Sequence, residues 1–167
     1  MRRILRLIDR INDQVGKLIS LLVIFMVGIM VYEVVARYVF DSPTIWAYET
    51  ITFLLAGYAI LGGAYVLRHG AHVNMDILYR RLSPRKQAIL DLVTSGLFFL
   101  FCAVLIWKGS EWASRSIRLS ETTTSTWAPV VYPIKMAIPV GAFLLLIQGL
   151  AKFIRDLMTA VTGERPE

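Results

Sequence analysis

The chain has 167 residues, of which 56% are hydrophobic and only 18% are charged, and its mean hydropathy is +0.60. Soluble domains carry about a quarter charged residues, so this composition excludes an ordinary soluble domain and indicates a membrane protein. The formal net charge of +6 does not indicate a nucleic-acid partner, because the basic residues flank apolar runs and form no single patch. The single cysteine, Cys102, excludes an intramolecular disulfide.

The chain begins with an amphipathic segment, residues 1–14, in which apolar residues recur at helical spacing and arginines occupy largely the other face. A basic helix of this kind is typical of a membrane surface. The apolar run that follows is longer than the hydrophobic region of a signal peptide, about 7 to 15 residues, and no small-residue cleavage site follows it. We therefore expect the run to be an uncleaved first span.

Four uncharged runs predict four transmembrane helices, because each run reaches the ~20 residues that cross a bilayer once it is extended past one flanking charge. The loop between the second and third helices, residues 72–82, is weakly amphipathic and predicts a second surface helix. We therefore expect one all-α membrane domain over residues 1–167, with spans at about 15–39, 44–68, 84–110 and 130–154.

The basic residues and the tryptophans lie on opposite sides of this predicted membrane. Most Lys and Arg residues fall in the N-terminal tail, in the segment 68–86 and in the C-terminal tail, which places that side and both termini in the cytoplasm. All four tryptophans fall on the outer side: Trp46, Trp107, Trp112 and Trp127. An aromatic belt at the headgroups and a contact with another protein explain this one-sided placement about equally well.

Small residues and prolines give further local predictions. In the second helix, Ala59 and Gly63 form a small-xxx-small pair that lets another helix approach closely. Ser42-Pro43 and Ser83-Pro84 resemble an N-cap followed by proline at the first helical position, and they predict where the second and third helices begin. Pro139 predicts a kink in the fourth. No internal repeat of the kind that builds many transporters is visible, which counts against a complete transporter in one chain.

Ionisable residues within predicted spans are functional candidates. Glu33 and Arg37 lie four residues apart on one helical face, so Glu33 is either a proton or ion site or half of a structural ion pair. Because Arg37 can neutralise Glu33, we favour the structural interpretation. Glu49 lies near the start of the second helix, where a negative charge suits the helix dipole, and it could also bond Arg37.

Other chemistry finds little support in the sequence. His69, His72 and Asp76 are a weak candidate metal site, because zinc normally takes three or four ligands and the sequence holds no further histidine. Haem within the bundle is disfavoured because both histidines lie at the cytoplasmic edge. No Ser-His-Asp arrangement, glycine-rich phosphate loop or paired cysteine motif appears. We therefore expect neither an enzyme nor a resident cofactor or metal.

One ordered set of motifs runs through most of the chain. It comprises the run Tyr32–Phe40, then Pro43, Trp46 and Glu49, then Leu61–Tyr65, Arg68, His72 and Asp76, and finally Trp127–Pro129, Tyr132-Pro133 and Pro139–Gly141. In order and spacing these motifs resemble the small membrane subunit (Q-type) of tripartite ATP-independent periplasmic (TRAP) transporters. Tyr48 departs from the pattern, since such proteins often carry an acid there, and this weakens any paired acidic site.

The resemblance implies sodium-driven uptake of a carboxylate-bearing solute across the bacterial inner membrane. A periplasmic binding protein would deliver the solute to a large multi-span subunit, and the small subunit would be a fixed scaffold surrounded otherwise by membrane lipid. Arg37, Trp46 and Glu49 would contact the large subunit, Trp112 and Trp127 would help to dock the binding protein, and Arg68, His72 and Asp76 would order the inner loop. The main alternative is a self-sufficient small exporter in which Glu33 takes up protons.

Overall fold

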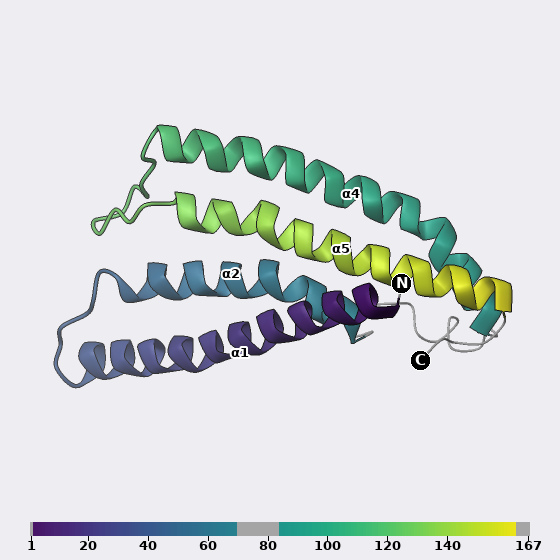
Figure 1. The fold of residues 1–167 in the computed structure, drawn as a ribbon. Helices are drawn as coiled ribbons and strands as arrows, with labels where there is room; N and C mark the ends of the chain where they lie inside the picture. The colour runs from purple at the N-terminus through teal and green to yellow at the C-terminus, as the bar shows by residue number, and fades with distance from the viewer. Residues whose placement is uncertain (1, 70–83, 163–167) are drawn as a thin grey trace.

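The computed structural model describes residues 2–69 and 84–162, and within these ranges it is entirely helical apart from the connections. Four helices follow one another along the chain (Figure 1): α1 (Arg2–Tyr38), α2 (Ala47–Arg68), α4 (Pro84–Arg118) and α5 (Tyr132–Thr162). Each is long and apolar enough to cross a membrane. The predicted all-α fold with four spans is confirmed.

Three of the helices are longer than a bilayer requires. At a rise of 1.5 Å per residue, the 37 residues of α1 extend over about 55 Å, against a hydrocarbon core of ~30 Å. The 35 residues of α4 and the 31 of α5 also exceed the core. Residues 2–14, for which the sequence predicts an amphipathic surface segment, continue into the first span as one helix. In this first part of α1, Asp9 and Asn12 form hydrogen bonds with residues of α5.

The helices form two antiparallel hairpins that lie side by side (Figure 1). α1 contacts α2, α4 contacts α5, and the contact between α2 and α5 joins the two hairpins, with a smaller contact between α1 and α5. The start of α1 and the end of α5 lie at the same end of the molecule. We call this the inner end, which the sequence predicts to be cytoplasmic, and the opposite one the outer end.

Small residues mediate the closest helix contacts. Most of the buried apolar residues are alanines. A Cβ placed on Gly141 of α5 would lie 2.6 Å from Cγ2 of Ile60 and 2.7 Å from its carbonyl oxygen, so α2 and α5 nearly touch there. Within α2 itself, Gly63 faces Leu145 of α5, whereas Ala59 is exposed. The close approach of α2 and α5 therefore depends mainly on Gly141 of α5, and less on the small residues of α2.

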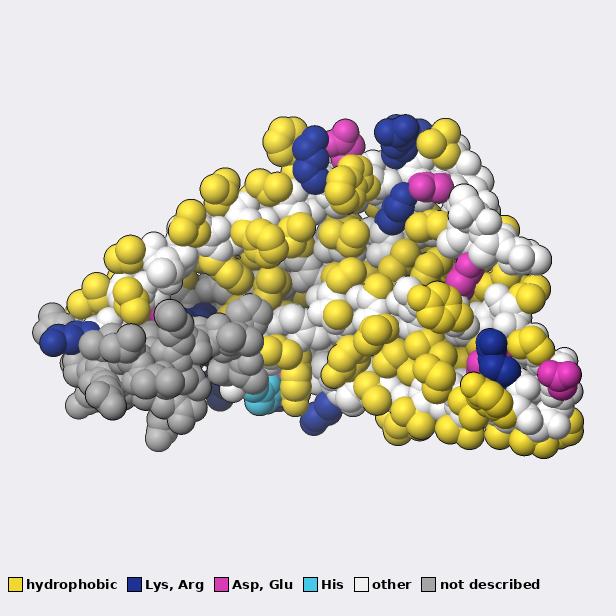
Figure 2. Space-filling model, turned by 180° about the vertical axis from the view of Figure 1, so that it is seen from behind, with side chains coloured by type: hydrophobic (Ala, Val, Ile, Leu, Met, Phe, Trp, Pro, Cys, Tyr) yellow, Lys and Arg dark blue, Asp and Glu magenta, His cyan; other side chains and the backbone are white. Residues whose placement is uncertain are grey.

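Large apolar side chains cover the outside of the molecule. Leu18, Ile24 and Leu97, for example, are each about two-thirds or more exposed. Figure 2 shows apolar side chains spread over one face, with charged side chains gathered toward the ends. A surface of this extent needs lipid or another protein against it.

The connections at the outer end are held by specific backbone bonds. After α4, Ser120 adopts a left-handed conformation (φ 45°), and the N–H of Glu121 donates to the carbonyl of Ser116 at 3.1 Å, as in a Schellman cap. α2 begins at Ala47 rather than at Ser42-Pro43, so that predicted start is wrong. The physical reason is a tertiary bond from Thr44 to Glu33, described next. α4 does begin at Pro84, and Pro139 lies inside α5.

Candidate functional site

An ion pair and a threonine join α1 to the start of α2 at the outer end. The Nε atom of Arg37 donates to Oε1 of Glu33 at 3.1 Å, and a second guanidinium nitrogen bonds the same oxygen. The other carboxylate oxygen accepts the backbone N–H of Thr44 at 3.1 Å and also its hydroxyl. Glu33 is buried, while the side chain of Arg37 is half exposed. Both oxygens of Glu33 are therefore engaged in fixing the turn between the helices.

Trp46 lies immediately before α2, two residues after Thr44. Its ring stacks on Tyr32 of α1, with the ring centroids 5.9 Å apart. The two rings form part of an open cavity of about 560 Å³ that Val35, Phe40 and Pro43 also line. The sequence predicted a role for Trp46 but not this aromatic groove, which depends on the pairing of the two helix ends.

Glu49 connects the first turn of α2 to the loop between α4 and α5. Its Oε2 atom accepts a hydrogen bond from the hydroxyl of Thr123 at 3.2 Å, instead of the contact with Arg37 that the sequence suggested. The loop is itself ordered by an antiparallel bridge between Thr122 and Val130. Glu49 therefore helps to hold the outer loop against the hairpin of α1 and α2.

A second acid orders the same loop. Glu121 accepts a hydrogen bond from Lys135 in the first turn of α5 and forms an ion pair with it. This bond lowers the pKa of the Glu121 carboxyl below its ordinary value.

Trp112, on the last turns of α4, and Trp127, within the loop, are 58% and 41% exposed. Both indoles are therefore available at the outer surface.

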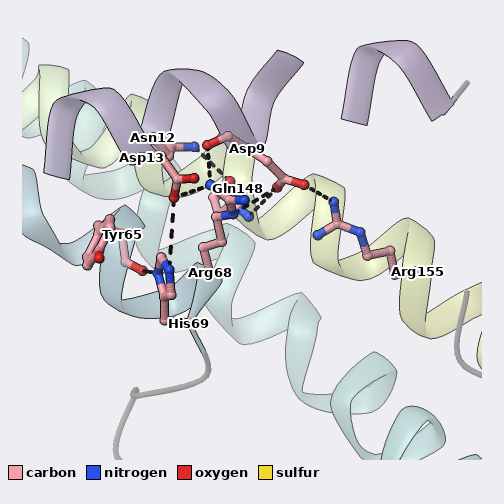
Figure 3. Close-up of polar contacts among 8 residues, drawn as sticks. All are labelled: Asp9, Asn12, Asp13, Tyr65, Arg68, His69, Gln148 and Arg155. Atoms are coloured by element: carbon pink, nitrogen blue, oxygen red, sulfur yellow. Dashed lines mark hydrogen bonds and ion pairs between the residues drawn. The ribbon is translucent and has the colours of Figure 1, made fainter. Parts of the chain in front are cut away.

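A polar network joins three helices at the inner end (Figure 3). Arg68 at the end of α2 donates through Nη1 to the carbonyl oxygen of Asp9 at 2.6 Å and forms ion pairs with Asp9 and Asp13 of α1. Arg155 of α5 pairs with the same Asp9 from the other side. Asp9 is thus held by arginines from two different helices.

The buried part of this network consists of two amides. Nδ2 of Asn12 donates to Oε1 of Gln148 at 2.7 Å, and Nε2 of Gln148 donates to Oδ1 of Asp9 at 3.1 Å. Asn12 and Gln148 are 2% and 1% exposed. We call the whole set the inner polar cluster: Asp9, Asn12, Asp13, Arg68, Gln148 and Arg155. Its members bond one another across α1, α2 and α5, so it fixes the first turns of α1 to the rest of the molecule.

Sequence reasoning identified only Arg68 of this cluster as a site residue. Two signals were present: Asp9 and Asp13 lie one helical turn apart, and Asn12 and Gln148 are polar residues among apolar ones. Neither signal names a partner, because the paired residues are far apart in the chain.

The candidate metal residues are placed only in part. Nδ1 of His69 lies 3.0 Å from the carbonyl oxygen of Tyr65, and its Nε2 atom lies 4.0 Å from Asp13. His72 and Asp76 lie outside the described residues. Within residues 2–69 and 84–162, no group of three or more His, Cys, Asp or Glu side chains is arranged to hold a metal ion.

The chain is similar to known membrane proteins. The family model described as "Tripartite ATP-independent periplasmic transporters, DctQ component" matches residues 26–159. The chain belongs to this family. It is therefore a membrane component of a transporter, the small permease subunit, and not an enzyme. The matched range includes the Glu33–Arg37 pair and Gln148 but leaves out Asp9, Asn12 and Asp13.

Three named relatives agree with this assignment. The C4-dicarboxylate TRAP transporter small permease protein DctQ of Rhodobacter capsulatus is 29% identical over 106 residues, which cover 64% of this small permease subunit and 46% of the relative. A putative TRAP small permease protein of Haemophilus influenzae is 29% identical over 63% of this chain and 65% of its own length. The sialic acid TRAP transporter small permease protein SiaQ of Vibrio cholerae is 20% identical, over 95% of this chain and 90% of the relative.

The alignments differ in how much of each relative they include. The chain spans about half the length of the Rhodobacter relative and just under two-thirds of the Haemophilus relative. The match to the Vibrio protein, by contrast, runs through nearly all of both chains.

Proposed function

We propose that this small permease subunit is a fixed scaffold in the bacterial inner membrane, where it packs against and stabilises a large multi-span TRAP subunit. The observation that carries this proposal is the outward placement of its large apolar side chains, combined with polar contacts that join the helices at both ends. Such a molecule presents an extensive apolar surface on helices that are bonded to one another at each end. A subunit that moved solute itself would instead need polar groups within its spans that are free to exchange partners.

The proposals for the transported solute and the driving ion rest on the family resemblance. Two relatives are named for C4-dicarboxylates and for sialic acid, which both carry carboxylate groups. We infer that the complete transporter takes up a carboxylate-bearing solute, delivered by a periplasmic binding protein and driven by a sodium gradient. In this arrangement the solute and ion sites lie in the large subunit, and this chain holds the large subunit in place without binding solute or ions itself.

For the contact with the large subunit we propose the outer part of α1 and α2. Arg37 offers a half-exposed guanidinium, and Trp46 and Tyr32 border an open aromatic groove. Glu49 supports the same region through the outer loop. Farther along α2, the exposed Ala59 leaves room for a partner helix to come close, whereas Gly63, one turn later, faces Leu145 of α5.

The other proposed contacts lie at the two ends. The exposed indoles of Trp112 and Trp127 suit a transient contact with the periplasmic binding protein, since tryptophan is enriched at interfaces. Arg68 has its described contacts in α1, so we propose that it fixes the inner end of α2, from which the segment carrying His72 and Asp76 departs.

The role of Glu33 distinguishes this proposal from the proton-coupled exporter. A proton carrier must release its carboxylate partners in each cycle, whereas both oxygens of Glu33 accept hydrogen bonds from Arg37 and Thr44. This supports a structural role for Glu33. A measurement of proton flux by the purified chain in liposomes tests it, because flux that Glu33→Gln abolishes would favour the exporter.

The interface proposal is tested by matched tryptophan variants. We expect Trp46→Ala to reduce both copurification of the large subunit and solute uptake, because it removes one wall of the aromatic groove. Trp107→Ala is the control: Trp107 is equally an outer tryptophan, but it is 69% exposed on α4 and its described ring contact is only with neighbouring Lys108. Equal effects of the two substitutions, or none, would contradict the assignment of the groove.

A further inference from the structure

A small pocket lies at the inner end, between three helices, and none of its lining residues belongs to the inner polar cluster. It has a volume of about 110 Å³, with one wall from the end of α2, one from α4 and one from α5. Its lining residues are Leu67, Asp91, Thr94, Ser95, Phe98, Gly149, Lys152, Phe153 and Asp156. One part of this lining is charged and the rest is largely apolar.

The charged part is built around one ammonium group. Nζ of Lys152 donates to Oδ2 of Asp91 and, at 2.9 Å, to Oδ2 of Asp156. The three side chains remain 39%, 18% and 21% exposed, so a ligand can reach them. They combine one positive with two negative charges. A ligand that carries both a cation and an anion complements this set better than a ligand with either charge alone.

The apolar part is closely packed. The ring of Phe98 lies directly on Gly149, where an added Cβ would come within 2.2 Å of Cε1. Phe99 contacts both Phe98 and Phe153 edge-on, with centroids 5.7 Å apart in each case. These walls belong to the membrane-spanning helices, so the molecules that meet them are lipids or a partner subunit.

We propose that this pocket binds the headgroup of a zwitterionic aminophospholipid of the phosphatidylethanolamine type, in the leaflet at the inner end. The primary ammonium of the lipid donates to Asp91 and Asp156, and its phosphate lies toward Lys152. A volume of about 110 Å³ accepts a two-carbon ammonium chain but no acyl chain, so the acyl chains lie along the apolar surface outside. The inference depends on the membrane fold alone and not on the transport role proposed above.

The headgroup chemistry predicts a clear selectivity. A trimethylammonium group is bulkier and has no N–H to donate, so a phosphatidylcholine loses the bonds to the carboxylates. A phosphatidylglycerol offers no cation and brings its negative charge to a set that already holds two. Loss of a hydrogen bond to a charged group corresponds to about a tenfold change in affinity.

Native mass spectrometry of the full-length, delipidated chain tests the proposal, with titrations of palmitoyl-oleoyl phosphatidylethanolamine, phosphatidylcholine and phosphatidylglycerol. We expect the first bound molecule of phosphatidylethanolamine to bind about tenfold more tightly than either of the others. Mono-, di- and trimethylated phosphatidylethanolamine should bind progressively more weakly. Equal affinity for the three lipids, or a preference for phosphatidylglycerol, would overturn the proposal.

Two kinds of variant locate the site. Asp91→Asn with Asp156→Asn should remove the preference, while Asp41→Asn at the outer end is a matched control that should keep it. Thr94→Phe fills the pocket without a change of charge. Among the described residues, the Thr94 hydroxyl bonds carbonyls of its own helix, so the fold should survive. If Thr94→Phe and the double variant both retain the wild-type preference, the lipid binds elsewhere and the proposal fails.

Discussion

The hydrogen bond between Asn12 and Gln148 gives a quantitative test of the inner polar cluster. Asn12→Leu removes the donor and leaves Oε1 of Gln148 buried without it, at a side chain that is 1% exposed. An unsatisfied buried acceptor costs ~1–3 kcal/mol in proteins generally, whereas hydrogen bonds between membrane helices average ~0.6 and reach ~1.7 kcal/mol. We therefore expect a loss of about 1–2 kcal/mol in the free energy of unfolding.

The expected shift can be measured by thermal unfolding of the purified chain in detergent. For a protein of this size, 1 kcal/mol corresponds to a change of roughly 2–4 °C in Tm, so Asn12→Leu should lower Tm by about 2–8 °C. Gln14→Leu is the matched control: Gln14 lies two residues along the same helix and is exposed. Its Tm should change little, since exposed substitutions usually alter stability by less than ~0.5 kcal/mol.

The double substitution separates the hydrogen bond from simple loss of packing. Gln148→Leu also removes the bond to Asp9 and should cost more than Asn12→Leu. Once Gln148 is apolar, Asn12→Leu should cost little or nothing further, because no buried acceptor is left behind. A coupling energy of at least ~0.5 kcal/mol is expected for residues in contact. Strictly additive effects, or an unchanged Tm for Asn12→Leu, would refute the role assigned to this pair.

Three further predictions concern other contacts. Gly141→Ala should lower Tm by several degrees, because the new Cβ meets Ile60. Gly62→Ala is the control: its new Cβ would meet no atom within 4 Å, so Tm should be unchanged or slightly raised. Similar Tm values for the two variants would contradict the close contact at Gly141. The lowered pKa of Glu121 means that its bond to Lys135 stabilises the outer loop above pH 4.5, its ordinary pKa, and is lost as the pH falls below it. Limited proteolysis of the loop should therefore increase only in acid, and a loop equally protected throughout would contradict this. Thr44→Val should increase proteolysis of the connection between α1 and α2 at neutral pH, and unchanged cleavage would show that its hydroxyl does not hold that turn.

The sequence predicts the helices well because long apolar runs leave no alternative in a membrane. A backbone surrounded by hydrocarbon must bond itself, so a run such as Leu18 to Tyr32 is helical whatever it packs against. Local signals failed where a tertiary contact outweighed them. Ser42-Pro43 has the form of a helix start, yet the bonds from Thr44 to Glu33 keep that segment irregular and delay α2 to Ala47.

The inner polar cluster was beyond sequence reasoning for a different reason. Helical periodicity tells which residues of α1 share a face, but an amphipathic face suits a membrane surface and a protein neighbour equally. Asp9 binds Arg155 and Gln148, which lie far away in the chain, and only the arrangement of α1 beside α5 brings them together. Asn12 and Asp13 lie on the side of α1 that contacts α5 and α2.

The two ends of α1 are held in the same way. At each end a carboxylate of α1 accepts hydrogen bonds from groups outside its own turn: Asp9 at the inner end and Glu33 at the outer end. Between them, small residues let the helices come close while the large apolar side chains face outward. A frame that is fixed at both ends and apolar around its middle is suited to hold a neighbouring subunit in place.

The composition of the complex purified from the native membrane tests the scaffold role most directly. The chain would carry an affinity tag, be extracted in mild detergent, and be analysed by mass spectrometry for the identity and stoichiometry of what copurifies. We expect one large, many-span TRAP subunit per tagged chain. A lone chain or a homodimer that persists across mild detergents would contradict the scaffold role and would make Glu33 the first residue to examine for transport.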